Sequence, residues 1–460
     1  MNKSRITFYG GANGVTGSNF MLEDLSSGLE ADNLKILVDC GLHQGNKIVE
    51  NSNREPFNYN PQEIEALFVT HAHLDHIGRI PKLVRDGFRG KIYSTYPTKE
   101  IAELSLRDSL GVMEKEAKKD KHAIFYREED IVKTMELWQG MDYHQSIKIG
   151  RFSVQFLDAG HILGSAMVEF TSGGKKTIFS GDLGNSPAPL LKPAEKISDV
   201  NYLLMESVYG DREHENKDSR RQHLKDIILS TMQAGGVLMI PAFSIERTQE
   251  ILFEVENLME ASKIPLVPVF LDSPLAISIT DIYRRYERYF NKEVKYIINN
   301  GDGIFHFPQL QQTRTTEESK EIAQRLGRKI IIAGSGMSNG GRILHHEKRY
   351  LPQKNNTLLI AGYQAAGSLG RLLSEGAKEV TIMGERIRVR SRIENLSAYS
   401  AHMDSTALSE YAGQTADTLE ETFVVMGEPK SSLALVQRLK DEWAIKASSP
   451  NDGDSREIDF

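Results

Sequence analysis

Cysteine and long apolar runs are scarce in this sequence of 460 residues. The single cysteine, Cys40, excludes an internal disulfide and any zinc cluster built from cysteine thiolates. No segment approaches the roughly 20 consecutive apolar residues that a membrane-spanning helix needs. The N-terminal residues also lack the apolar core of a signal peptide. We therefore expect a cytoplasmic protein without a membrane partner.

An excess of basic residues is also missing, since the formal net charge is -7. Proteins that bind nucleic acid non-specifically usually carry positive charge over much of their surface. An RNA substrate stays compatible with this sequence because a local basic cleft or a metal ion can hold phosphates. The hydrophobic content of 40% and charged content of 26% are those of a globular protein, and the length favours two domains.

The chain has two parts with different sequence patterns. The first part contains strand-like runs with Gly-rich turns, then a polar helical stretch over about 98–139, then further strands at 152–157, 166–170 and 176–180. From about residue 208, strand-like runs alternate with longer helical stretches, a pattern that favours a parallel α/β sheet. Charged residues over 211–219 are typical of a boundary between the two parts.

The run His71-Ala72-His73-Leu74-Asp75-His76 follows a short strand-like segment at 66–70. Imidazole nitrogens and carboxylate oxygens are preferred zinc ligands, and catalytic zinc sites keep one position for water. His71 and His73, at a spacing of two, can converge on one ion. Asp75 and His76 then point elsewhere and can hold a second ion. This run predicts a metal-dependent hydrolase.

His161 and Asp182 occupy Gly-rich turns that each follow a predicted strand. Each is weak evidence alone because a histidine or aspartate in such a turn is usually structural. After the run at 71–76, however, their order becomes specific, and a carboxylate between two cations can bridge them.

This order of motifs resembles the metallo-β-lactamase fold, a four-layered αβ/βα sandwich. The resemblance implies that His71, His73 and His161 hold one zinc ion. It further implies that Asp75 and His76 hold the other, that Asp182 bridges the two, and that Asp39 supports the ligand loop without binding metal.

Later segments resemble a branch of that superfamily, the β-CASP nucleases, over nearly the whole chain from Val15 to about Asp404. The implied architecture is a metallo-β-lactamase domain over 1–207 and 386–460 with an inserted β-CASP α/β domain over 208–385. The segments that carry the resemblance are Leu204–Arg212, Pro241–Arg247, Leu271–Ala276, Gly334–Met337, Gly340–Arg342 and Gly362–Gln364.

The β-CASP resemblance implies a zinc-dependent ribonuclease that hydrolyses single-stranded RNA through a metal-bound hydroxide, and relatives often self-associate. Asp75, Asp182, Glu206 and His402 would be the catalytic residues. Glu206 is expected to accept a hydrogen bond from a ligand histidine, and His402 to protonate the leaving oxygen. The expected substrate-binding residues are Ser400, His402, Arg247, Arg342, Ser335 and Gly336. For either arginine, a structural ion pair is the alternative to phosphate binding.

One position departs from the family pattern. The segment Val424-Val425-Met426-Gly427-Glu428 has methionine where the family has a histidine ligand of the second zinc. A thioether is a poor zinc ligand beside imidazole and carboxylate. We therefore expect one firmly bound zinc, with a loosely bound second zinc or a manganese ion beside it. Two alternatives stay open: an RNA-binding pseudonuclease, and a metallohydrolase for a small phosphodiester or ester.

Overall fold

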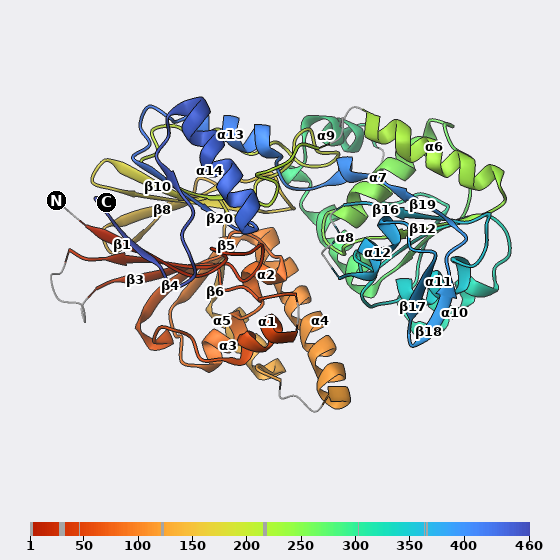
Figure 1. Cartoon of the computed structure of the whole chain (residues 1–460), viewed down its shortest axis with the longest axis horizontal. Helices are drawn as coiled ribbons and strands as arrows, with labels where there is room; N and C mark the ends of the chain where they lie inside the picture. Colours follow the sequence, from red (N-terminus) through yellow and green to blue (C-terminus); the bar gives the residue numbers. More distant parts are fainter. Residues whose placement is uncertain are drawn as a thin grey trace. The chain divides into compact units, whose positions relative to one another are not determined.

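The computed structural model describes residues 3–26, 33–45, 47–120, 124–214, 219–301, 303–362, 364 and 367–460. Within these ranges, no helix combines the length and apolar character needed to cross a membrane. The chain forms two compact units, shown in Figure 1. The first unit contains residues 1–186, 193–213 and 402–460, and the second contains 187–192 and 214–401. The domain ranges 1–207, 208–385 and 386–460 follow from the family resemblance and remain predictions.

The first unit is built on two seven-stranded sheets. In spatial order, the strands of one sheet are β22 (Ser455–Ile458), β1 (Ser4–Gly10), β2 (Asn19–Asp24), β3 (Lys35–Val38), β4 (Ile64–Phe68), β5 (Lys91–Thr95) and β6 (Trp138–Met141). Those of the other are β21 (Ala447–Ser448), β20 (Glu421–Val425), β11 (Tyr202–Glu206), β10 (Lys175–Phe179), β9 (Ala166–Ser172), β8 (Phe152–Asp158) and β7 (Ile147–Ile149).

Side-chain alternation along the strands explains why the two sheets stack. Ala166, Val168 and Phe170 of β9 join Phe8, Phe20 and Phe68 of the other sheet in one core. Met167, between them in sequence, faces the opposite side of its sheet, as the period of two requires. There it packs in a second core with residues of α13 (Ser405–Gly413) and α14 (Pro429–Trp443).

Helices cover both outer faces of the first unit, as Figure 1 shows. The first sheet is covered by α3 (Ile80–Arg85), α4 (Tyr96–Asp120) and α5 (Glu128–Leu137), with the short α1 (Lys47–Asn51) and α2 (Leu74–Ile77) nearby. The helices α13 and α14 cover the other sheet. The predicted αβ/βα sandwich is confirmed, and the predicted helical stretch at 98–139 consists of α4 and α5.

The second unit contains a six-stranded sheet in which every pair is parallel, as the alternating pattern predicted. Its strand order is β14 (Leu310–Gln312), β13 (Val269–Asp272), β15 (Lys329–Ala333), β12 (Val237–Pro241), β16 (Thr357–Ile360) and β19 (Arg392–Asn395). A separate hairpin consists of β17 (Glu379–Ile382) and β18 (Glu385–Arg388). The helices are α6 (Arg220–Gln233), α7 (Arg247–Glu260), α8 (Pro274–Arg285), α9 (Lys292–Asn299), α10 (Thr316–Gln324), α11 (Ile343–Tyr350) and α12 (Leu369–Ser374).

Candidate metal centre

The loops that carry the predicted ligands leave the carboxyl ends of their strands. The run at 71–76 follows β4, His161 follows β8, and Asp182 follows β10. The strands β3 and β4 are parallel, as are β10, β11 and β20. Loops from the same ends of parallel strands meet at one edge of a sheet. This topology gathers side chains that are far apart in the sequence.

Asp39, at the end of β3, holds the histidine-rich loop in place. One carboxylate oxygen accepts a hydrogen bond from the Thr70 amide at 2.8 Å, and the other accepts one from the Thr70 hydroxyl at 2.8 Å. The second oxygen also lies 2.7 Å from Nδ1 of His76. Because Asp39 occupies Nδ1, the Nε2 atom of His76 is left as the metal-binding nitrogen. Asp39 thus supports the loop, as the sequence predicted.

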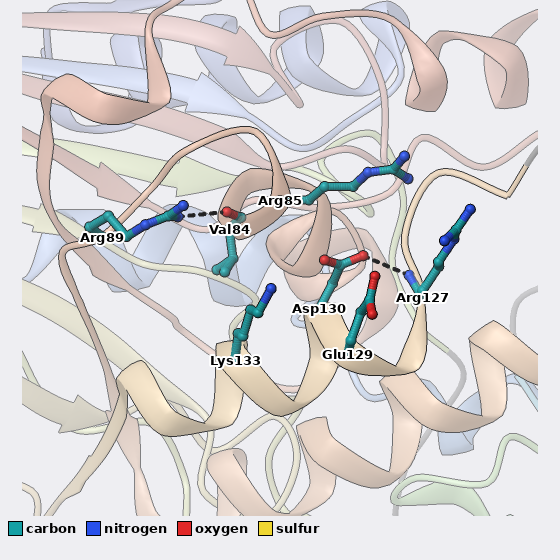
Figure 2. A pocket seen from close by; sticks show the side chains of 7 residues that line it. All are labelled: Val84, Arg85, Arg89, Arg127, Glu129, Asp130 and Lys133. Carbon is teal, nitrogen blue, oxygen red and sulfur yellow. Dashed lines mark hydrogen bonds between the residues drawn. The ribbon is translucent and has the colours of Figure 1, made fainter.

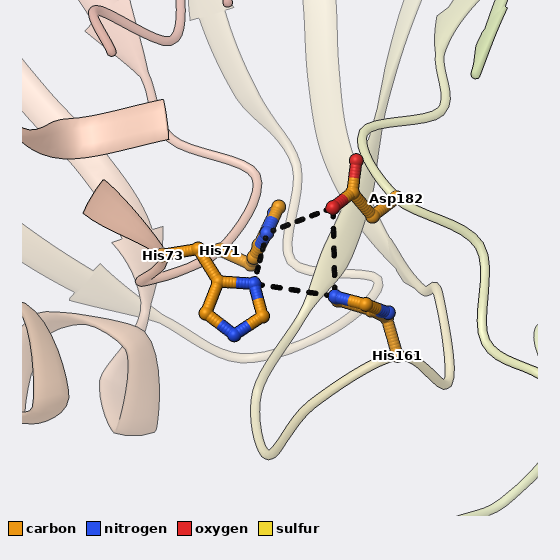
Figure 3. A group of neighbouring side chains, drawn as sticks. All are labelled: His71, His73, His161 and Asp182. Carbon is orange, nitrogen blue, oxygen red and sulfur yellow. Dashed lines mark hydrogen bonds and ion pairs between the residues drawn. The ribbon is translucent and has the colours of Figure 1, made fainter. Parts of the chain in front are cut away.

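Four buried or partly buried side chains form a tight cluster in Figure 3: His71, His73, His161 and Asp182. Nδ1 of His73 lies 3.1 Å from Nε2 of His71 and 3.3 Å from Nε2 of His161. An oxygen of Asp182 lies 3.4 Å from Nε2 of His71 and 3.5 Å from Nε2 of His161. One nitrogen or oxygen of each residue lies within 4.8 Å of those of the others. Three imidazoles and a carboxylate that converge in this way match the ligand set of a zinc ion.

The protonation of the cluster also suits a metal. Burial, and after it the charges of neighbouring imidazoles, hold the pKa of His73 and of His161 well below the usual value. Both rings are therefore neutral at physiological pH. Neutral imidazole is the form that binds a metal ion.

Asp182 also faces a second group of possible ligands. Its other oxygen lies 3.4 Å from Nε2 of His76, and this nitrogen lies 3.8 Å from an oxygen of Asp75. Nε2 of His76 and Oδ1 of Asp182 are buried and have no hydrogen-bond partner among the described residues. The two atoms face each other at 3.4 Å as an ion pair without hydrogen-bond geometry, and an imidazole nitrogen and a carboxylate oxygen placed in this way can bind a cation between them. The residues present therefore fit a metal at this position too.

Glu206 and His402 form a pair beside the cluster. Nδ1 of His402 lies 3.2 Å from each oxygen of Glu206 and 3.9 Å from an oxygen of Asp182. Burial lowers the pKa of His402, but the charge and hydrogen bond of Glu206 outweigh burial and raise it to about 9. Glu206 was expected to accept a hydrogen bond from one of the ligand histidines. The structure places it instead against His402 and the Leu183 amide, which donates to it at 2.6 Å.

Both predicted phosphate-binding arginines have partners within the second unit. Arg247, the first residue of α7, is buried and paired with Glu250, and its guanidinium lies 5.6 Å from the centre of the Tyr399 ring. Arg342 donates to Asp272 at 2.8 Å and to the Thr313 carbonyl at 2.9 Å. These ion pairs are the alternative that the sequence left open, and phosphate binding by either arginine remains a prediction.

Ser335, Gly336 and Ser400, which were also predicted to bind substrate, lie in the second unit, whereas His402 lies in the first. The hydroxyl oxygen of Ser335 accepts the backbone amides of Asn339 and Gly340 at 3.1 and 3.2 Å, so it closes its own turn. Gly336 packs against Phe243, because a Cβ atom there would lie 2.6 Å from that ring. Ser400 is buried. Tyr363, from the Gly362–Gln364 motif, lies outside the described residues.

Met426 follows β20 at the same end of the sheet as the metal cluster, as the family pattern requires. It is 2% exposed and belongs to the core between the two sheets. A Cβ atom on Gly11 would lie only 2.5 Å from the Met426 sulfur, so the thioether packs against the Gly11 backbone. Its contacts are those of a core residue.

Thr70 is the site residue that sequence reasoning missed. Its hydroxyl lies 3.0 Å from Nδ1 of His71, besides donating to Asp39. A small hydroxyl residue between a buried strand and the first ligand histidine is the signal that would have found it.

The superfamily and the family follow from comparison with known proteins. Residues 28–202 match the metallo-beta-lactamase superfamily domain, residues 248–373 the Beta-Casp domain, and residues 386–450 the Zn-dependent metallo-hydrolase RNA specificity domain. The first of these matches agrees with the sandwich and the histidine cluster described above. The other two narrow the class, and the chain belongs to the β-CASP family of the metallo-β-lactamase superfamily.

Two curated relatives match nearly the whole chain. Ribonuclease TTHA0252 of Thermus thermophilus is 35% identical over 432 residues, which are 94% of this chain and 95% of that protein. Transcription termination factor FttA of Methanosarcina mazei is 32% identical over 460 residues, covering 96% of this chain and 70% of that protein. A solved structure of a protein of unknown function from Enterococcus faecalis has a TM-score of 0.57 and 14% identity, over 99% of this chain and 100% of that one. That likeness bears on the fold alone.

Proposed function

We propose that this chain is a zinc-dependent ribonuclease that hydrolyses phosphodiester bonds of single-stranded RNA. The observation that carries the proposal is the position of Asp182, one oxygen of which faces His71 and His161 while the other faces His76. A shared carboxylate of this kind suits a pair of metal ions. The similarity to a ribonuclease over almost its full length supports RNA as the substrate.

The proposed ligands are His71, His73 and His161 for one ion and Asp75 and His76 for the other, with Asp182 between them. Metal ions held there would supply Lewis acidity and lower the pKa of water. The loosely held second ion, zinc or manganese, follows from Met426, whose sulfur packs in the core. Self-association and a cytoplasmic location stay predictions.

In the proposed reaction, His402 is the acid that completes the departure of the leaving oxygen. Glu206 holds its Nδ1 side at 3.2 Å, which leaves Nε2 to donate the proton. Ser400, two residues earlier in the chain, is proposed to hold the scissile phosphate together with His402. Glu206 acts through His402 and is therefore a positioning residue.

A pseudonuclease that holds RNA without cutting it is the second candidate, and Met426 is the observation that favours it. The six other predicted ligands are all present: His71, His73, Asp75, His76, His161 and Asp182. Loss of one ligand leaves the tight four-residue cluster intact, so we favour the nuclease.

One assay separates the candidates. Purified protein with added zinc or manganese is given labelled single-stranded RNA and, separately, a small chromogenic phosphodiester. We expect cutting of RNA by the native protein and none by Asp75→Ala/His76→Ala. The matched control is Asp142→Ala/His144→Ala, which removes the same residue types from an exposed turn and should cut normally. RNA retained but uncut would support the pseudonuclease, and hydrolysis of the small ester alone would support the third alternative.

A further inference from the structure

Two hollows lie on the helical side of the first unit, and no residue of the metal cluster lines either one. The first, which we call the cationic pocket, has a volume of about 260 Å³ and lies between α3 and α5. The second, the aromatic hollow, has a volume of about 620 Å³ and lies beside the segment at 54–61. Arg85 lines both of them, so the two hollows adjoin at this side chain.

The cationic pocket has four positively charged side chains, which Figure 2 shows on α3, on α5 and in the segments beside them: Arg85, Arg89, Arg127 and Lys133. Two carboxylates, Glu129 and Asp130, also line it. Asp130 is buried and accepts the Arg127 backbone amide at 2.8 Å, so its charge is directed at the start of its own helix.

The four cations of the pocket outnumber its two carboxylates, which leaves an excess of positive charge. The Arg89 guanidinium donates to the carbonyls of Val84 and Phe88 at 2.9 and 2.6 Å, and carbonyls carry no net charge. Both Arg85 and Lys133 are exposed. In a chain with a net charge of -7, a local excess of cations around a cavity indicates an anionic ligand.

The aromatic hollow is lined by the rings of Phe57 and Tyr59 beside further cations, and Tyr9 packs against Tyr59 with ring centres 4.7 Å apart. Phe57 and Tyr59 are partly exposed and stack with ring centres 5.2 Å apart at an angle of 30°. The ammonium of Lys82 lies 4.4 Å from the centre of the Phe57 ring, and Asp86 pairs with this lysine. Arg54 and Arg85 add two more cations to the lining.

Rings for stacking next to a row of cations are what unpaired nucleotides require. Bases of a single strand stack on aromatic side chains, while the phosphates follow a positive groove. A duplex has its bases stacked internally and could use only the cations. We propose that the aromatic hollow and the cationic pocket together bind single-stranded RNA away from the metal centre. Bases contact the exposed parts of the Phe57 and Tyr59 rings, and phosphates contact Arg85, Arg127 and Lys133. The choice of RNA over DNA rests on the proposed function.

The test measures RNA affinity in the Asp75→Ala/His76→Ala background, so that cleavage cannot interfere. Fluorescence anisotropy with a labelled single-stranded RNA is recorded at several salt concentrations. We expect Arg85→Glu/Lys133→Glu to weaken binding at least tenfold. Because each lost phosphate contact lowers the slope of log affinity against log salt by about 0.7, the slope should fall by roughly 1.4. Arg85→Lys/Lys133→Arg keeps both charges and should bind like the background protein.

Stacking and charge are separated by a second pair of variants. Phe57→Leu should weaken binding by about tenfold, the order of one lost base stack, without changing the salt slope. The matched charge control is Lys148→Glu/Lys440→Glu, which reverses two exposed lysines of the same unit that line neither hollow. Thermal unfolding of each variant checks that it is folded.

The outcomes distinguish this inference from the proposed function. If the native protein cuts RNA but the Arg85 and Phe57 variants bind as tightly as the background protein, the proposed RNA-binding surface is contradicted and the proposed nuclease activity is supported. If nothing is cut but affinity depends on Arg85, Lys133 and Phe57, the surface stands and the nuclease fails. An equal loss of affinity in the lysine control, or equal binding of a duplex of the same length, would also overturn the surface.

Discussion

The two units each contain a buried aspartate surrounded by polar side chains, and the two aspartates are satisfied in opposite ways. In the second unit, Asp272 accepts four hydrogen bonds from side chains of its own chain, at 2.7 to 2.8 Å. The donors are Thr313, Ser319, Arg342 and His346. In the first unit, Asp182 faces histidine nitrogens at 3.4 to 3.5 Å, and one of its oxygens has no hydrogen-bond partner among the described residues.

This difference separates a structural carboxylate from a metal-binding one. Burial raises the pKa of Asp272, but its hydrogen bonds outweigh burial and lower the pKa to about 2, so its charge is fully balanced within the chain. Around Asp182, burial lowers the pKa of His71, His73 and His161, so these neutral imidazoles and the carboxylate point their lone pairs at one another, whereas Asp182 and Asp39 raise the pKa of His76. Such a group needs a cation to balance it. Asp272 and Asp182 both lie close to histidine side chains. They differ in the hydrogen bonds that their carboxylate oxygens accept.

Asp182→Asn, which changes the metal-binding aspartate, should have the largest effect of these variants. The amide cannot bridge two cations, so RNA cleavage should fall by roughly a thousandfold, equivalent to several kcal/mol of lost charge stabilisation. Cleavage rates and bound zinc, measured by mass spectrometry, check this. Asp142→Asn, on the surface, should leave both unchanged; normal cleavage by Asp182→Asn would contradict the assigned site.

Asp272→Asn should break the closed network of the second unit. It leaves the Arg342 guanidinium and its neighbours without a counter-charge, which should lower the free energy of unfolding by about 3 kcal/mol. Urea titration measures the loss, and Asp226→Asn on an exposed helix face is the control. The zinc content of the folded protein should stay the same. A variant as stable as the native protein would show that the four hydrogen bonds are dispensable.

Met426→His should strengthen binding of the second metal ion. An imidazole at the end of β20 restores a ligand type that suits zinc, so affinity for the second ion should rise by about 10- to 100-fold. Zinc titration followed by metal analysis gives the stoichiometry, which should move from about one ion to two. Met426→Leu keeps the apolar packing against Gly11 and should bind metal like the native protein. Two firmly held zinc ions in the native protein would show that Met426 does not weaken binding of the second ion.

Glu347 gives the second unit a pH dependence of its own. Burial raises its pKa to about 8, and the hydrogen bond from the Ser338 hydroxyl offsets only part of this shift. Between the ordinary value of 4.5 and about 8, the folded chain holds a proton that the unfolded chain has released. The free energy of unfolding contributed by this group therefore falls as pH rises through that window.

Glu347→Gln should remove this dependence. The difference in unfolding free energy between pH 5 and pH 8 should shrink by about 3 to 4 kcal/mol. Urea titrations at the two pH values measure it, beside Glu317→Gln on an exposed helix. An unchanged difference would show that Glu347 does not cause this pH dependence.

Local sequence patterns predicted much of the fold and part of the site. The alternation after residue 208 indicated the parallel sheet because this pattern depends on neighbours a few residues apart, whereas the sandwich was implied by the resemblance of the metal-binding motifs to the metallo-β-lactamase superfamily. The motifs at 71–76, His161 and Asp182 follow strand ends, and parallel strands carry such ends to one edge. Arg247 and Glu250, three residues apart on α7, form a pair that helical spacing alone allows.

Partners distant in the sequence were not predictable in this way. Glu206 was expected beside a ligand histidine and lies against His402, 196 residues later. For Arg342 the sequence left phosphate binding and a structural ion pair open, and it could not predict the pairing with Asp272, 70 residues earlier. Both outcomes depend on which loops the packed sheets bring together, and no local pattern encodes that.

The sequence by itself determined the residues that can bind metal, the departure at Met426 and the class of fold, because residue type and short-range spacing set ligand chemistry and secondary structure. Only the tertiary structure decided which carboxylates are balanced within the chain and which are left for a cation. It alone also brought Phe57, Arg85 and Lys133 into the linings of two adjoining hollows. The physical reason is that burial and hydrogen-bond pairing arise from packing between segments that are remote along the chain.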